Sequence, residues 1–151
     1  MKKVIFYILV GWCLVACNSS VTSPEMVDEC PPIYPDYVGV TIPATIAPMN
    51  FSCLDGECER VDVKVTGGKN GEIHVNDKMV LFPQDEWQSL LKENQGDSLL
   101  FTVCIKKEGK WKQYRPFSMY VSPFPIDYGI VYRKIAPGFE VYSKMGIYER
   151  D

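Results

Sequence analysis

The chain has 151 residues, of which 46% are hydrophobic and 23% are charged, and this is the composition of an ordinary globular protein. If the first sixteen residues are removed as a secretion signal, 135 residues remain (151 − 16), which is enough for one domain with its own core. Lys2 and Lys3 leave with the signal, so the remaining chain has 14 basic and 19 acidic residues and a net charge of −5. Because nucleic-acid-binding domains are usually basic, this balance argues against a nucleic-acid partner.

The amino-terminal segment has the pattern of a bacterial lipoprotein signal. Lys2 and Lys3 precede an uncharged run over residues 4–16, which is too short for a stable transmembrane helix. The run ends in Leu14-Val15-Ala16-Cys17, which resembles the lipobox of bacterial lipoproteins. The resemblance implies a signal peptide over residues 1–16 and diacylglycerol on the thiol of Cys17. Two or three acyl chains, palmitate among them, would hold the protein durably in a membrane.

The residues after Cys17 predict which membrane carries the protein. In lipoproteins of this type an Asp after the cysteine retains the protein in the inner membrane, whereas this chain has Asn18. Residues 18–23 also lack the acidic cluster that directs some lipoproteins to the cell surface. We therefore expect the outer membrane, at its periplasmic face. Residues 17–32 are rich in Ser, Pro and acidic side chains, which predicts a flexible tether.

The body of the chain, residues 33–122, has the period-two alternation of half-buried β-strands. Apolar residues alternate with others over residues 38–42, 61–66 and 73–76, and the cluster Gly67-Gly68-Lys69-Asn70-Gly71 predicts a hairpin turn between the last two. Leu99, Phe101, Val103 and Ile105 form the inward face of a long strand, and a second long strand returns over residues 111–121.

One segment of the body changes to helical spacing. Residues 79–82 form a short apolar run that Pro83 closes, and residues 85–92 follow with Trp87, Leu90 and Leu91 on one face. Asp85 and Glu86 at the start and Lys92 at the end favour a helix through its dipole. We predict a single short helix in a connection between strands.

Six or seven strands at roughly ten-residue spacing are typical of an all-β domain. We predict an immunoglobulin-like or fibronectin-like β-sandwich over residues 33–122. A small Greek-key barrel is the alternative fold. Residues 123–151 contain Pro breaks but keep many apolar and aromatic side chains, so we expect this connector or docking segment to pack on its own domain or on a partner.

Four cysteines remain after the signal and the lipidated residue are set aside: Cys30, Cys53, Cys58 and Cys104. An even number in an oxidising compartment indicates disulfides, and four cysteines allow three pairings. Cys53 and Cys58 bracket an Asp-Gly turn, so a bridge between them is geometrically reasonable. Cys104 lies on the outward side of its strand and is expected to be a free thiol or to pair with Cys30.

The sequence lacks the groupings that catalysis or metal binding needs. His74 is the only histidine and belongs to a predicted strand, where an exposed structural side chain is the favoured interpretation over a Ser-His-Asp or Cys-His site. The spacing of Cys53 and Cys58 without a second ligand pair does not fit a four-ligand zinc site. We therefore expect no enzyme activity and no cofactor.

Aromatic side chains gather in the second half of the chain. Six residues form the predicted ligand or partner surface: Trp111, Tyr114, Arg115, Tyr120, Tyr128 and Tyr132. Stacked rings beside cations could bind a glycan. However, Trp111 and Tyr114 have opposite parity in a continuous strand, so a core face plus a solvated basic face is the favoured interpretation of this stretch.

Three stretches together support a wider resemblance: Ile33-Tyr34-Pro35-Asp36-Tyr37 with residues 41–43 and 46–51, Trp111 with Tyr114-Arg115-Pro116-Phe117, and residues 132–138 with residues 145–150. They are similar to the amino-terminal region of periplasmic lipoproteins that continue into a WD-repeat-like β-propeller related to translocation accessory proteins. Some members of that family are linked with cytochrome biogenesis. The resemblance implies that residues 123–151 are a connector toward a propeller, and it implies no active site.

Two classes of function follow from the sequence. The first is a lipid-anchored, non-catalytic interaction or docking module with a protein partner in the cell envelope. The second is a small-ligand or glycan-binding lipoprotein that uses the aromatic surface.

Overall fold

A computed structural model describes residues 21–54, 56–124, 130–134 and 146–150. The predicted signal peptide and Cys17 lie outside the described residues. The described part is mostly β-strand with one short helix, which confirms the all-β prediction. Its elements are β1 (Glu25–Met26), β2 (Ile33–Tyr34), β3 (Thr41–Pro43), β4 (Ser52–Cys53), β5 (Arg60–Gly67), β6 (Glu72–Asp77), α2 (Gln84–Glu93), β7 (Ser98–Lys107), β8 (Lys110–Gln113), β9 (Phe117–Ser122), β10 (Ile130–Lys134) and β11 (Gly146–Arg150).

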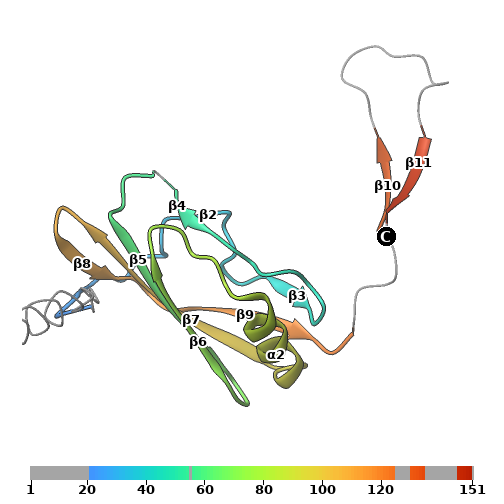
Figure 1. The fold of residues 1–151 in the computed structure, drawn as a ribbon, viewed down its shortest axis with the longest axis horizontal. Coiled ribbons are helices and arrows are strands. Elements are labelled where there is room, and N and C mark those ends of the chain that lie inside the picture. The colour runs from blue at the N-terminus through green and yellow to red at the C-terminus, as the bar shows by residue number, and fades with distance from the viewer. Residues whose placement is uncertain (1–20, 55, 125–129, 135–145, 151) are drawn as a thin grey trace, which may run out of the picture.

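The main sheet is built around β7, its longest strand (Figure 1). β5 pairs with β7 on one side and β6 lies beyond β5, whereas β8 and β9 follow one another along the other side of β7. β1 and β3 then pair in parallel with β8 and β9. The two amino-terminal strands thereby cover the edge that β8 and β9 would otherwise expose.

The alternation of β5 and β7 places one continuous apolar surface in the core. Val61, Val63 and Val65 are fully buried, and Val63 lies opposite Val103 while Val65 lies opposite Phe101. Full burial of such a side chain stabilises the fold by about 1.5–3 kcal/mol. The predicted hairpin is confirmed, because β5 and β6 pair antiparallel across a turn that Gly71 ends at a φ of 83°.

The second predicted long strand is interrupted by a β-bulge between β8 and β9. Cys104 pairs with Gln113 and Phe101 pairs with Phe117, so three steps along β7 correspond to four along the other strand. Pro116, which has no N–H for the ladder, lies within this extra-residue segment. The bulge reverses which side chains face the core, and this corrects the prediction of one continuous strand over residues 111–121.

The end of the predicted tether, residues 17–32, is attached to the sheet. Glu25 pairs with Lys112, and the backbone N–H of Val27 donates to the carbonyl of Gln113 at 2.9 Å. The N–H of Arg115 donates to the carbonyl of Glu29 at 3.0 Å. Residues 25–29 therefore belong to the folded body, which corrects the prediction of a flexible tether over this part.

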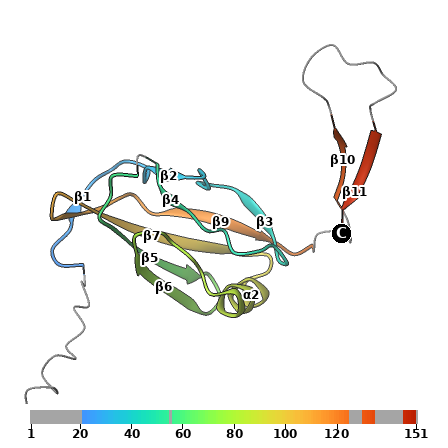
Figure 2. The ribbon, with the colours of Figure 1, turned by 45° about the horizontal axis from the view of Figure 1, so that its top comes forward.

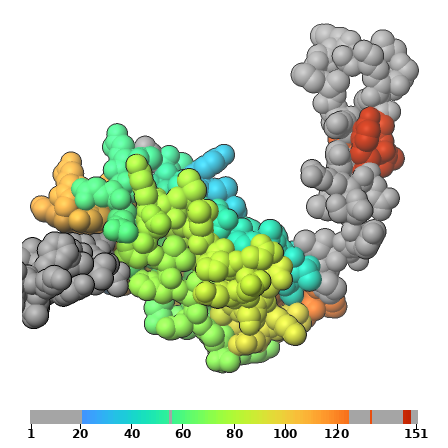
Figure 3. Space-filling model, viewed as in Figure 1, coloured from blue at the N-terminus to red at the C-terminus, as the bar shows by residue number. Residues whose placement is uncertain are grey.

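Helix α2 packs on the core face of the sheet with the residues that the sequence predicts. Trp87, Leu90 and Leu91 are buried. The ring of Trp87 stacks on Phe82 at 5.1 Å between centroids, and Phe82 meets Phe101 of β7 edge to face at 6.3 Å. Figure 3 shows the helix and the chain that leads into it covering this side of the molecule.

A small second sheet completes the layer over the core. β2 pairs antiparallel with β4, and Phe51 forms an isolated bridge with Val80. Ile33, Phe51 and Val80 point into the core cluster, so this layer packs face to face on the main sheet (Figure 2). The predicted strand over residues 38–42 is shorter than expected, because only Thr41–Pro43 forms a ladder with β9.

Asn94 joins the end of α2 to the β5–β6 turn and is fully buried. Its Oδ1 accepts the backbone N–H groups of Lys69 at 2.8 Å and Asn70 at 3.3 Å, and its Nδ2 donates to the carbonyls of Asn70 at 2.7 Å and Leu90 at 2.8 Å. Both polar atoms of the amide are therefore satisfied, as a buried amide requires.

The segment from residue 123 onward contains a hairpin of its own. β10 and β11 pair antiparallel from Ile130 with Arg150 to Lys134 with Gly146, and within the described chain they form a sheet separate from the others. No helix in the described residues is long and apolar enough to span a membrane.

Candidate functional site

The structure does not bring the predicted aromatic surface together. Trp111 is only 7% exposed and Tyr114 only 9%, whereas Arg115 and Tyr120 are exposed. Trp111 lies opposite Lys106 on the outer face, and the bulge turns Tyr114 into the core cluster. Tyr128 lies outside the described residues, and Tyr132 belongs to β10. Two of the six predicted residues are thus buried, Trp111 on the outer face and Tyr114 in the core, which is a correction to that surface.

The predicted disulfide is formed between Cys53 and Cys58, whose Cα atoms are 6.3 Å apart. Gly56 lies inside the closed loop with a φ of 66°, and its N–H donates to the carbonyl of Cys53 at 3.3 Å. The left-handed φ explains why glycine suits this turn. The covalent bond ties the end of β4 to the start of β5, so it fixes the small sheet against the main sheet.

The outer side of the small sheet is apolar. Tyr34 lies directly opposite Ser52, and the bridge between Phe51 and Val80 brings Met79 opposite Ser52 from the other side. Leu54 and Leu81 share this side by period-two alternation. Four large side chains here are more than half exposed: Tyr34 at 64%, Leu54 at 64%, Met79 at 53% and Leu81 at 56%. We call these four residues the apolar face.

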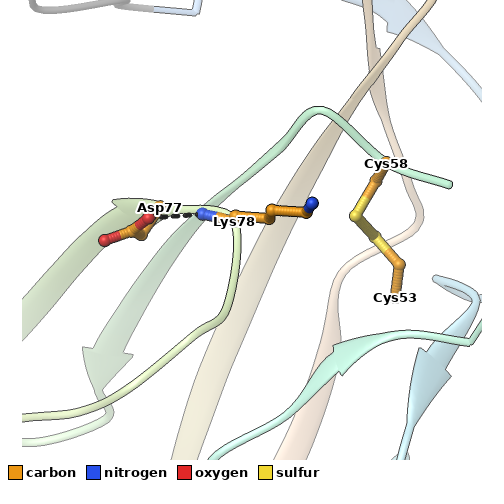
Figure 4. The surroundings of a disulfide bond; sticks show 4 residues. All are labelled: Cys53, Cys58, Asp77 and Lys78. Atoms are coloured by element: carbon orange, nitrogen blue, oxygen red, sulfur yellow. Dashed lines mark hydrogen bonds between the residues drawn. A yellow bond between two sulfur atoms is a disulfide. The ribbon is translucent and has the colours of Figure 1, made fainter. Parts of the chain in front are cut away.

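A groove of about 470 Å³ opens beside the disulfide, and Met79 and Leu81 of the apolar face line it. Its lining residues are Ser52, Cys53, Gly56, Cys58, Asp77, Lys78, Met79 and Leu81. Figure 4 shows Lys78 extending toward the disulfide, while its backbone N–H donates to the Asp77 carboxylate at 2.6 Å. The groove therefore combines an apolar floor with one carboxylate and one ammonium group, which suits binding rather than acid–base chemistry.

A polar cluster on the outer face of the main sheet contains the chain's only histidine. The Asp62 carboxylate accepts the amide of Asn76 at 2.7 Å and lies 2.8 Å from Nε2 of His74. Cys104 lies opposite Asp62 across the ladder. Burial, and then the charge of Asp62, raise the pKa of the Cys104 thiol to about 11. The thiol is therefore protonated at neutral pH, so this cluster does not supply a thiolate nucleophile.

Cys30 and Cys104 are free thiols, which agrees with one of the two predicted outcomes for Cys104. Cys30 is exposed, and its sulfur lies 3.2 Å from Nη2 of Arg115. Within residues 21–54, 56–124 and the two hairpin strands, no three His, Cys, Asp or Glu side chains are grouped to hold a metal ion.

The sequence did not predict the apolar face. The alternation of Met79, Val80, Leu81 and Phe82 was visible only as an apolar run, although it already places two side chains on each side of an extended segment. The pairing of Phe51 with Val80, across 29 residues of chain (80 − 51), decides which pair points to solvent.

Comparison of the chain with protein-family models, curated proteins and solved structures gives no match. The resemblance to propeller-linked periplasmic lipoproteins therefore stays a prediction. The functional assignment depends on the geometry of the apolar face and its groove.

Proposed function

We propose that the protein is a lipid-anchored, non-catalytic interaction module of the cell envelope. Acylation of Cys17 attaches it to the outer membrane at the periplasmic face, and the folded body docks a protein partner through the apolar face. The lipobox-like sequence before Cys17 supports the anchor. The single observation that supports docking is the exposure of Tyr34, Leu54, Met79 and Leu81 on one side of the small sheet, where Met79 and Leu81 also line a groove.

The apolar face has the properties of a protein-binding surface. Exposed apolar side chains that gather in one patch mark interaction sites, because scattered ones are normal but contiguous ones are costly to leave in water. The patch is also held rigidly, since the Cys53–Cys58 bond closes one side of it and the Phe51–Val80 bridge closes the other. Rigidity lowers the entropic cost of binding.

The arrangement of layers supports a β-sandwich of the immunoglobulin-like or fibronectin-like class. The main sheet and the small β2–β4 sheet enclose one core, and α2 fills the remaining part of the covering layer. In such sandwiches the connections and sheet ends carry the binding residues, while the core only holds them in place. The segment between β6 and α2, which supplies Met79 and Leu81, is a connection of this kind.

A docking function is favoured over glycan binding by the burial of Trp111 and Tyr114. Glycan binding by stacking needs exposed ring faces. Six residues were predicted to form the glycan-binding surface. Among those whose side chains the structure describes, two are exposed, Arg115 and Tyr120.

Photo-cross-linking in intact cells tests the docking function. A benzophenone side chain replaces Met79, and a matched chain carries it in place of Leu100, which is 49% exposed on the outer face of β7. We expect a protein adduct from position 79 that Leu81→Lys in the same chain abolishes, and no such adduct from position 100. Equal adducts from both positions, or none from position 79, would contradict the proposal.

A further inference from the structure

Strand β6 forms an uncovered edge of the main sheet. It pairs with β5 on one side, and within the described chain no strand pairs with its other side, which runs along the lower edge of the molecule in Figure 2. The opposite edge of the sheet is closed, because β1 and β3 pair with β8 and β9. An open edge presents unpaired backbone N–H and C=O groups, which are a template for another strand. The edge at β6 is therefore a place where a further extended segment can bind.

The hydrogen bonds between β5 and β6 show which backbone groups point to the free edge. The N–H of Gly67 donates to the carbonyl of Gly71 at 2.9 Å. Hydrogen-bonded pairs recur at every second residue of an antiparallel ladder, so residues 73 and 75 also exchange bonds with β5. Glu72 and His74 alternate with these residues. Their N–H and C=O groups therefore point away from β5, to the free edge.

β6 lacks the features that usually protect an edge strand. Its sequence, Glu-Ile-His-Val-Asn-Asp, contains no Lys and no Pro. Its six residues pair with β5 in one continuous register without a bulge. One outward carbonyl, that of Asn76, accepts a hydrogen bond from Nη2 of Arg60 at 3.5 Å. Within the described residues, no strand reaches the outward groups of Glu72 and His74.

A small acidic groove lies between β6 and α2, and we call it the acidic groove. Its volume is about 180 Å³. Ile73 and Leu90 supply apolar lining, and Glu72, Glu86 and Glu93 supply three carboxylates. Among the described residues that line it, none is basic. A Lys or Arg side chain fits this chemistry, because its stem can pack on apolar residues while its cationic end meets carboxylates.

The three carboxylates of the acidic groove are engaged to different degrees. Glu72 forms an ion pair with Lys64 at 2.8 Å. Glu93 accepts a hydrogen bond from the neutral amide of Asn70 at 3.0 Å. Within the described residues, neither Glu86 nor Glu93 has an ion pair with a basic side chain. Two negative charges at this edge are therefore not balanced by a cation of the same chain.

We propose that β6 accepts an extended, basic segment of a protein partner as an additional strand. The backbone of that segment bonds to the outward N–H and C=O groups of Glu72 and His74, and one of its Lys or Arg side chains enters the acidic groove beside Ile73. In such strand addition, main-chain hydrogen bonds give affinity and a side-chain pocket gives specificity. The inference goes beyond the proposed function, because it uses neither the apolar face nor the groove beside the disulfide.

Charge favours a basic segment over the β6 strand of a second copy. β6 carries Glu72 and Asp77 and no Lys or Arg, so a second copy would bring acidic side chains to an acidic groove. The added strand should also alternate, because successive side chains of a strand point to opposite faces of the sheet. Its core-side positions lie beside Ile73 and Val75, of which Val75 is only partly buried. We therefore expect one basic and one apolar side chain at these positions, and polar side chains between them.

Three labelled peptides test the backbone and the charge separately. The peptide Thr-Val-Thr-Lys-Thr, placed antiparallel to β6, sets its Lys beside Ile73 and its Val beside Val75. A second peptide has Glu in place of the Lys. A third keeps the side chains of the first but is N-methylated at its threonines, which removes the N–H groups that face β6. Fluorescence anisotropy with the full chain in detergent should show saturable binding of the first peptide and binding at least about tenfold weaker for the other two.

Variants of the chain test the same two features. His74→Pro removes an N–H from the free edge without removing a bond to β5, and the melting temperature checks that the fold is kept. Glu86→Gln with Glu93→Gln removes two charges from the acidic groove. Asp85→Asn is the matched control, because this neighbouring acid does not line the acidic groove. We expect the first two variants to weaken binding of the Lys peptide, and Asp85→Asn and Met79→Lys to leave it unchanged.

The outcomes distinguish strand addition at β6 from docking at the apolar face. If the Lys peptide does not bind, or if either control peptide binds as tightly, strand addition of a basic segment is wrong. Sedimentation of the peptide-free chain should give a monomer. A wild type that dimerises while His74→Pro stays monomeric would identify a second copy as the occupant and overturn the proposal. Peptide binding without a cross-link from position 79 in cells would support strand addition and contradict only the proposed function.

Discussion

Cys104 lies opposite Asp62 on the outer face of the main sheet, and its thiol is buried. The Asp62 carboxylate accepts a hydrogen bond from the Asn76 amide and lies close to the His74 ring. A thiol in this position is stabilised in its protonated form, because both burial and a neighbouring negative charge disfavour the thiolate. The pair explains why the chain's only histidine, a carboxylate and a cysteine can be neighbours without forming a nucleophilic site.

This relationship predicts a difference between the two free thiols. Cys104 should react with iodoacetamide much more slowly than exposed Cys30 at pH 8, and its rate should rise as pH approaches about 11. Asp62→Asn should lower the pKa of Cys104. The raised pKa also means that the protonated Cys104 thiol contributes fully to the stability of the fold below pH 9. This contribution is lost as pH rises toward 11. Equal alkylation of both cysteines at pH 8 would contradict the assignment.

Phe101 of β7 is fully buried and stacks on Phe117 at 4.9 Å between ring centroids. Phe101→Ala should lower the free energy of unfolding by about 3–5 kcal/mol, because it removes a large core ring and leaves a cavity. Leu100→Ala, one residue earlier and 49% exposed, should change it by less than about 0.5 kcal/mol. Denaturant titration measures the loss of unfolding free energy in both variants. Similar losses would show that Phe101 is wrongly assigned to the inward face of β7.

The Cys53–Cys58 bond should stabilise the fold and the groove together. Cys53→Ala with Cys58→Ala should lower the free energy of unfolding by about 2 kcal/mol, since a short closed loop restricts the unfolded chain modestly. Cys30→Ser, at an exposed free cysteine, should leave it unchanged. Peptide mass mapping of the oxidised wild type should recover Cys53 linked to Cys58, and a peptide that joins Cys53 to Cys104 would refute the pairing.

The lipid anchor is tested by Cys17→Ala. Without the thiol that accepts diacylglycerol, the protein should leave the membrane fraction or accumulate with its signal peptide uncleaved. Fractionation of envelopes and the intact mass of the protein measure both effects. Cys13→Ala, in the hydrophobic run before the lipobox-like sequence, is the matched control and should stay membrane-bound. Membrane-bound, acylated Cys17→Ala protein would reject the anchor.

The sequence predicts the local elements well where alternation alone decides the structure. The valines of β5, the inward face of β7 and the buried face of α2 all follow from spacing, because strand and helix periods are fixed by backbone geometry. The disulfide was also predictable, since five residues of chain separation and an Asp-Gly turn leave few other partners.

The sequence fails where one residue or one long-range pairing changes the pattern. The bulge before Phe117 reverses the parity of everything upstream, so Trp111 and Tyr114 exchange the faces that a continuous strand would give them. The attachment of residues 25–29 beside β8 and the bridge from Phe51 to Val80 join segments far apart in the chain. No local signal marks such pairings, and the apolar face depends on one of them.

Oxidation of methionines tests the docking function most directly. Met79 in the apolar face is 53% exposed, Met26 in β1 is 68% exposed and Met119 in the core is fully buried, so the chain carries its own controls. In dilute purified protein, peroxide should oxidise Met79 and Met26 and spare Met119. In intact envelopes we expect Met79 to become protected while Met26 is still oxidised. Oxidation of Met79 in envelopes as fast as that of Met26 would contradict a docked apolar face.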